Sequence, residues 1–198
     1  MTSRDEVLKS IRARRVPAMA LPALQHDWVR YADAFAQFKS VVEAAGARCD
    51  RVATPRDIAP LLATFGEFQA ATRTVSQVAG VAGTVALDDV DDPHDLETID
   101  WAIMPGEFGV AENGAIWVTD ERVKQRAIYF IVQHLALVLP ANQIVHTMHA
   151  AYERIQPGKS SLGLFIAGPS KTADIEQLLV IGAHGPRSLT VIAVGPTV

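Results

Sequence analysis

The chain has 198 residues, of which 49% are hydrophobic and 20% charged, and this is the composition of an ordinary globular domain. Its formal net charge of -4 provides no global basic field to recruit nucleic acid or an anionic membrane. No apolar run approaches the roughly 20 residues of a membrane span. The N-terminal segment lacks the apolar core of a signal peptide, so the expected location is the cytoplasm.

The first part of the chain predicts two helices, over residues 3–15 and 28–45. Ser3 is the expected N-cap of the first helix, and acidic residues follow in its first turn. The second helix carries apolar side chains at helical spacing and ends at Gly46. A linker with two prolines separates the helices. We therefore predict an N-terminal helical region over residues 1–46.

From residue 47 to residue 198 the sequence alternates between short apolar runs and helical patterns. Helices are expected over residues 54–66, 141–155 and 172–181. Strands are expected over residues 49–52, 72–78, 83–87, 101–104, 110–119, 135–139, 162–167 and 190–194. This alternation predicts an α/β domain over residues 47–198, with a mostly parallel sheet flanked by helices.

The chain has one cysteine, Cys49. One thiol cannot form an internal disulfide, and it cannot hold an iron–sulfur cluster by itself. A buried structural thiol is the expected role. The neighbouring histidines His134, His146 and His149 form no recognisable metal-binding motif. The sequence therefore predicts no metal site and no cofactor bound by this chain.

The first motif that could carry chemistry is Gly-Pro-Ser-Lys-Thr-Ala-Asp-Ile-Glu over residues 168–176. It follows an apolar run, and it predicts a strand, a tight turn and a helix N-terminus capped by Ser170 or Thr172. Free N–H groups there favour anions, and Lys171 would add a positive charge. Asp174 argues against a strongly anionic ligand, because it already complements the helix dipole. A capped helix without a ligand is the alternative interpretation.

The second motif is Gly-Ala-His-Gly-Pro-Arg over residues 182–187. His184 could transfer a proton near neutral pH, and Arg187 could hold a carboxylate through two hydrogen bonds. The alternative is a connection between elements that carries two polar surface residues.

The third motif is Glu-Asn-Gly over residues 112–114, between two apolar runs. Asn-Gly in this setting is a strong signal for a β-hairpin turn. A functional interpretation is equally open, in which a substrate approaches the backbone at Gly114 and Glu112 acts as an acid, a base or a hydrogen-bond acceptor.

Together, the three motifs resemble the LUD domain family, named for lactate utilization, and within it the lactate utilization protein C type. The family pattern is similar to Ala-Glu-Thr-Gly, then Gly-Pro-Ser-Arg-Thr-Ala-Asp-Ile-Glu, then Gly-x-His-Gly-Pro. The resemblance covers about residues 105–195. The chain departs from it at Asn113, where the family has threonine, and at Lys171, where a point charge replaces a planar guanidinium.

The resemblance implies a fold similar to that of ribose-phosphate isomerases and CoA transferases. On the three motifs we predict a site for a small carboxylate, with Glu112 as its catalytic residue. The predicted substrate-binding residues are Asn113, Gly114, Ser170, Lys171, Thr172, Asp174, His184 and Arg187.

The resemblance also implies a role as the cluster-free subunit of a bacterial system that oxidises L-lactate to pyruvate. Its partners would be cysteine-rich and ferredoxin-like proteins that carry the iron–sulfur clusters. Two alternatives stay open. One is a stand-alone enzyme of the isomerase or CoA-transferase type, and the other is a binding module for a small anionic metabolite, with the N-terminal helices as a docking arm. The sequence is also compatible with a homo-oligomer.

Overall fold

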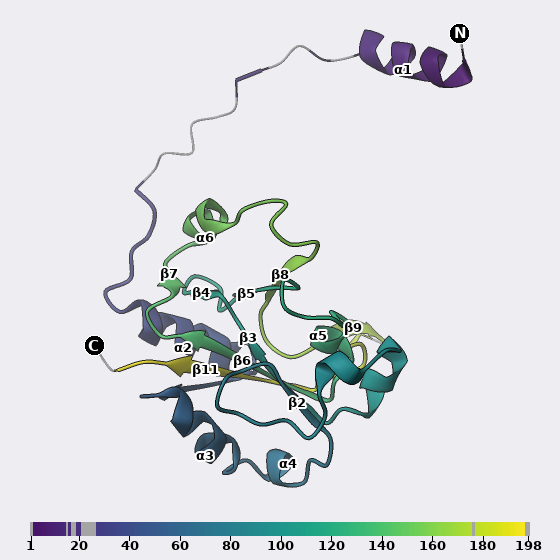
Figure 1. Ribbon diagram of the computed structural model, residues 1–198. Helices are drawn as coiled ribbons and strands as arrows, with labels where there is room; N and C mark the ends of the chain where they lie inside the picture. Colours follow the sequence, from purple (N-terminus) through teal and green to yellow (C-terminus); the bar gives the residue numbers. More distant parts are fainter. Residues whose placement is uncertain (1, 15, 17–18, 21–26, 176, 197–198) are drawn as a thin grey trace.

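A computed structural model describes residues 2–14, 16, 19–20, 27–175 and 177–196 of the chain, with the backbone alone at residues 174 and 175. A five-stranded sheet in the order β1-β11-β6-β3-β2 lies at its centre (Figure 1). The strands are β1 (Arg48–Val52), β11 (Ser188–Val194), β6 (His134–Pro140), β3 (Trp101–Pro105) and β2 (Thr74–Ser76). All four pairings are parallel, which confirms the predicted α/β class.

The central strand β6 shows why this sheet is covered on both faces. Its five residues from Leu135 to Leu139 are all buried, and their sequence is a continuous apolar run, as expected for an interior parallel strand. Leu137 joins the core under α2 (Ala34–Ala44), whereas Ala136 joins the core under α3 (Ile58–Leu62) and α4 (Gly66–Gln69). Figure 1 shows α2 on one side of the sheet and α3 and α4 on the other.

A second sheet lies on the same side of the central sheet as α2. Its order is β7-β4-β5-β8. Its strands are β4 (Phe108–Val110), β5 (Ile116–Thr119), β7 (Ile144–Val145) and β8 (Gly163–Ile166), and β7 leads into α6 (Met148–Arg154). Ile116 and Val118 of β5 belong to the same buried cluster as Phe38 of α2. The antiparallel β4–β5 hairpin turns at residues 111–114, where Asn-Gly predicted it.

The remaining short elements connect these layers. They are η1 (Pro55–Asp57), η2 (Leu87–Asp89), η3 (Pro93–Thr98) and α5 (Ile128–Ile131). The strand expected over residues 83–87 is reduced to a single bridge between Val85 and Val75. The helix expected over residues 141–155 is reduced to α6, because β7 takes up the residues before it.

The first helix begins at Ser3, as predicted, but its N-cap is a different residue, and the second helix begins later than predicted. Helix α1 (Ser3–Ala13) is capped by Thr2, whose side chain accepts from the backbone N–H of Asp5. None of its residues is buried, and Figure 1 shows it away from the body. Helix α2 begins only at Ala34, because Asp33 caps it through the N–H of Ala36, and residues 28–31 form neither helix nor strand. The domain boundary at residue 46 stays a prediction.

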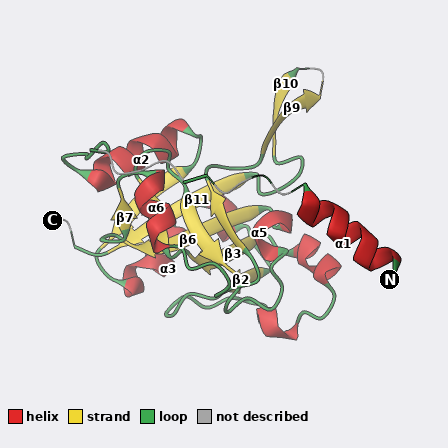
Figure 2. Cartoon of the chain, turned by 90° about the horizontal axis from the view of Figure 1, so that it is seen from above, coloured by secondary structure: helices red, strands yellow, loops and turns green. Residues whose placement is uncertain are grey.

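The helix predicted over residues 172–181 is wrong. This segment forms an antiparallel hairpin of β9 (Lys171–Ile175) and β10 (Leu178–Ile181), which projects from the body (Figure 2). The physical reason lies at its base, where the N–H of Gly182 donates to the carbonyl of Ser170 at 2.9 Å. The chain must therefore return to its starting point within twelve residues, which a hairpin achieves and a helix does not. The β-branched residues of β10 also favour a strand.

The core under α2 gives a stability prediction. Phe38 is fully buried, and its ring packs so closely on Gly109 that a Cβ there would lie 2.8 Å from the ring. Replacing Phe38 by alanine is expected to lower the free energy of unfolding by about 3–5 kcal/mol, as measured by urea denaturation. The control is Phe130→Ala, at a side chain that is 45% exposed, with an expected loss below about 1 kcal/mol. Equal losses in the two variants would contradict this account of the core.

Candidate functional site

Two of the three sequence motifs meet at the last turn of α2. A Cβ on Gly114, in the β4–β5 turn, would lie 3.1 Å from the backbone nitrogen of Val42. A Cβ on Gly168 would lie 3.0 Å from the carbonyl oxygen of Ala45. Both glycines have positive φ, 70° and 78°, so a side chain at either position would be strained as well as crowded. The helix end therefore brings together loops that lie far apart in the sequence.

Lys171 adds a charge to this junction. Its ammonium group donates a hydrogen bond to the carbonyl oxygen of Ala45, the C-cap residue of α2. A positive charge at a helix C-terminus is favourable because the carbonyl groups there lack helical partners. The Lys171 ammonium thus stabilises the end of α2, and any anionic ligand would share this ammonium with Ala45.

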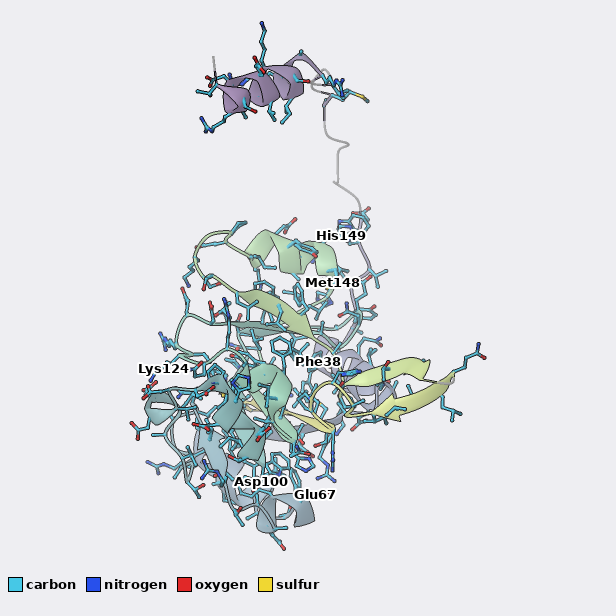
Figure 3. All side chains as sticks on the ribbon, turned by 90° about the vertical axis from the view of Figure 1, so that its right-hand side faces the viewer. Phe38, Glu67, Asp100, Lys124, Met148 and His149 are labelled. Atoms are coloured by element: carbon cyan, nitrogen blue, oxygen red, sulfur yellow. The ribbon has the colours of Figure 1, made fainter. Side chains whose placement is uncertain are left out.

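Glu112 contacts a different helix. Its Oε2 accepts a hydrogen bond of 2.8 Å from the backbone N–H of Met148, the first residue of α6. The side chain of Glu112 is exposed, and Figure 3 shows Met148 on α6 at the same end of the molecule as His149. A carboxylate in this position satisfies a free N–H and complements the helix dipole. The structure therefore gives Glu112 a structural role, and its catalytic role stays a prediction.

Asn113 completes the turn rather than facing a cavity. Its Oδ1 accepts a hydrogen bond of 3.1 Å from the N–H of Ala115, two residues further on. This arrangement is the local turn that asparagine commonly makes with its own backbone. Asn113 and Gly114 together account for the hairpin in structural terms.

A groove of about 310 Å³ gathers Ser170, Lys171 and His184. Its apolar floor includes Leu135 and Leu189, at the start of the two central strands. The loops that carry the polar residues are joined by a hydrogen bond of 2.9 Å from the N–H of Ser170 to the carbonyl of Pro186. Gly185 permits this approach, since a Cβ there would lie 3.0 Å from the Cβ of Ser170.

The other predicted site residues whose side chains the structure describes lie outside this groove. Thr172 is on β9, paired with Val180 in the hairpin. The backbone of Asp174 is on the same strand, but its side chain lies outside the described part of the structure. Arg187 packs against Gly182, where a Cβ would lie 2.4 Å from its Cγ. Glu112, Asn113 and Gly114 do not line the groove. Of the eight predicted residues whose side chains are described, the structure thus brings three into one cavity.

Comparison with known proteins decides the family. The LUD domain matches residues 35–194 of the chain, which is most of its length. The chain belongs to the LUD domain family. The matched part begins within α2 and ends with the last residue of β11, so it contains both sheets and all three motifs.

Relatives of this LUD domain include lactate utilization protein C of Geobacillus thermodenitrificans, which is 36% identical over 94 residues. That alignment covers 44% of the chain and 39% of the relative, so the chain matches less than half the length of that protein. An uncharacterized protein of Neisseria meningitidis is 24% identical over 184 residues, covering 90% of the chain and 76% of the relative.

A solved structure shares the fold of this LUD domain. It is a DUF162 family protein from Deinococcus radiodurans, with a TM-score of 0.54 and 22% sequence identity. The superposition covers 83% of the chain and 98% of that structure. It supports the architecture alone.

The LUD domain holds one polar contact that the sequence did not indicate. His134, at the start of β6, has its Nδ1 2.7 Å from the hydroxyl of Ser188, and its ring stacks on Trp101 with centroids 5.0 Å apart. Burial lowers the pKa of His134 and outweighs the opposing charge of Glu67, while Arg187 acts in the same direction as burial. No spacing motif could have revealed this pair, because the two residues are 54 positions apart.

Two further findings describe what the LUD domain contains within the described residues. No helix there is long and apolar enough to cross a bilayer. No group of three or more His, Cys, Asp or Glu side chains there is arranged to hold a metal ion. Cys49 is 1% exposed, and burial raises the pKa of its thiol to about 12, so this group is a core thiol rather than a nucleophile.

The contact between Glu112 and α6 predicts a difference between two substitutions. Glu112→Ala removes the acceptor of the Met148 N–H and is expected to lower the free energy of unfolding by about 0.5–2 kcal/mol. Glu112→Gln keeps a carbonyl oxygen in place and is expected to retain most of that stability. Thermal and urea denaturation of both variants would measure it, and equal losses would contradict the capping role.

His134 predicts a pH dependence of stability. Because its folded pKa is lowered, the unfolded chain takes up a proton first as the pH falls through about 6.5. The free energy of unfolding is therefore expected to decrease as the pH falls from neutral to the lowered pKa of His134. Below that pKa, His134 no longer contributes to the change of this free energy with pH. His134→Asn, which retains an acceptor near Ser188, is expected to reduce the decrease measured in urea titrations at several pH values.

The control for His134 is His94→Asn. His94 is fully exposed, and its hydrogen bond to Asp92 raises its pKa. Its protonation therefore favours the folded state, whereas protonation of His134 favours the unfolded chain. This variant is expected to keep the decrease at acid pH. An unaltered pH profile in His134→Asn would show that the buried histidine does not control it.

Proposed function

We propose that this LUD domain acts as the cluster-free subunit of a bacterial L-lactate utilization system in the cytoplasm. The observation that carries the proposal is the combination of the LUD match over residues 35–194 with several relatives named lactate utilization protein C. The alignments with those relatives cover about half of this chain or less.

The ligand in this proposal is a small carboxylate, L-lactate or pyruvate, in the groove of Ser170, Lys171 and His184. The support is chemical. The ammonium group of Lys171 can bind the carboxylate, and the hydroxyl of Ser170 and the imidazole of His184 can bind the hydroxyl or keto oxygen. The apolar floor of the groove can contact the methyl group. The Lys171 ammonium has three N–H donors, so it can turn towards a ligand while staying near Ala45.

The redox step in this proposal needs partner proteins. Oxidation of L-lactate to pyruvate removes two electrons and two protons, and the electrons require an acceptor. A chain with one buried cysteine cannot ligate an iron–sulfur cluster by itself. We therefore place the clusters in cysteine-rich and ferredoxin-like partners. In this arrangement, His184 supplies the imidazole of the groove.

Growth of a deletion strain tests the proposal. A bacterium that lacks this gene and has no paralogue is expected to lose growth on L-lactate and to keep growth on pyruvate. The wild-type gene should restore growth, and a Lys171→Ala and His184→Ala double variant should not, while folding normally. Copurification of tagged protein with iron–sulfur proteins is the matching biochemical readout. Normal growth of the deletion strain on L-lactate would refute the role.

A second candidate is a stand-alone isomerase-type or CoA-transferase-type enzyme in which Glu112 is the reacting carboxylate. The exposure of Glu112 beside a glycine turn favours it. It requires that Glu112→Gln abolish function without loss of stability, because an amide cannot act as an acid, a base or a carboxylate nucleophile. Retained growth of the Glu112→Gln strain on L-lactate would leave Glu112 with its capping role alone.

A further inference from the structure

The segment of residues 27–31, which we call the strap, is attached to the region of α6 by two histidines. The indole of Trp28 stacks on the imidazole of His149, with centroids 3.5 Å apart and planes 13° from parallel. The backbone N–H of Tyr31 donates to Nδ1 of His146 at 3.1 Å, and the Tyr31 ring lies over the same imidazole at 6.1 Å. Figure 3 shows His149 beside Met148, at the end of the body away from Asp100 and Glu67.

The strap forms one wall of a large open groove. This groove, of about 1000 Å³, has residues 27–30 on one side and residues 144–147 with the outer face of α6 on the other. It is separate from the groove of Ser170 and His184. The two histidine contacts join the two walls of this groove.

The two histidine contacts respond differently to a proton. A ring nitrogen accepts a hydrogen bond only when it carries no hydrogen, and both nitrogens of a protonated histidine carry one. The Tyr31 contact therefore requires unprotonated Nδ1 on His146, and protonation would set two N–H groups against each other. The stack of Trp28 on His149 persists after protonation, because a cation is attracted to an aromatic face.

We propose that residues 27–31 form a pH-sensitive strap, which is closed over the α6 groove while His146 is unprotonated and released at Tyr31 when His146 takes up a proton. In the open state, both ring nitrogens of His146 can carry a proton. In the closed state, a proton on Nδ1 removes the hydrogen bond from the Tyr31 N–H. Proton uptake therefore shifts the population towards the open strap. Histidine is the side chain that ordinarily changes charge between pH 5 and pH 8, so this is the range over which release is tested.

Charged groups of both signs lie around the groove. Carboxylates favour the protonated ring, whereas arginines disfavour it. The charged and titratable neighbours on the strap, the β4–β5 turn and α6 are Asp27, Arg30, Tyr31, Glu112, His149, Glu153 and Arg154. The direction of the response follows from the geometry of the Tyr31 contact.

The test is an NMR titration of the full chain from about pH 8 to about pH 5, following the Tyr31 amide and the His146 ring. The Tyr31 amide signal is expected to move with the same midpoint as the His146 ring. Acrylamide quenching of Trp28, isolated by comparison with Trp28→Phe, is expected to stay nearly constant, because the stack of Trp28 on His149 persists when the Tyr31 contact is lost. Unchanged amide signals of β6 would confirm that the core stays folded.

Two matched variants separate the histidines. His146→Asn places a non-titrating oxygen acceptor near the position of Nδ1, so the strap is expected to stay closed at both pH values. His149→Phe keeps a stacking partner for Trp28 without a proton site, so the response at Tyr31 is expected to persist. A Tyr31 signal that is flat while His146 titrates would overturn the proposal, and so would the same response in His146→Asn.

Discussion

The last turn of α2 is the constraint on which the arrangement of the motifs depends. Helix α2 is fixed to the central sheet by Phe38 and Val42, and its end then serves as a surface for two loops. Each loop approaches through a glycine, Gly114 or Gly168, because a Cβ would collide with the helix backbone. A change in the position of α2 would therefore displace two motifs at once. The close packing of protein interiors makes such a displacement costly.

This junction keeps the predicted site residues in two groups. Ser170, Lys171 and His184 line one groove, while Glu112 lies beyond the β4–β5 turn and is bonded to the first residue of α6. A single catalytic centre that uses both groups would need a ligand long enough to pass the end of α2. The lactate proposal needs only the first group, and for that reason it fits the observed geometry better than the isomerase-like alternative.

Much of the fold could be predicted because its signals are local. The continuous apolar run of β6 indicates a strand buried on both faces, and Asn113-Gly114 indicates a hairpin turn, without reference to the rest of the chain. The family could be recognised for the same reason, since its motifs are contiguous. Each of these features depends on residues within about one turn or strand of each other.

The errors arose where distant residues decide the local structure. The chain between Ser170 and Gly182 is a hairpin because its two ends bond to each other, and acidic residues near its start suggested a helix instead. The second helix begins six residues late because the residues before Asp33 are attached to His146 and His149. The pair of His134 and Ser188 arises from strand register, which no single-sequence pattern reports.

The hairpin of β9 and β10 has a consequence for how the domain opens. None of its described side chains is buried, and Leu178, Leu179 and Ile181 face solvent. A two-stranded hairpin of this kind gains little from packing, so it separates from the body at a lower free energy than the central sheet does. Lys171 is its first residue and also holds the carbonyl of Ala45, so fraying of this arm uncaps α2. The opening of this weakly packed hairpin and the capping of α2 are thus coupled through Lys171.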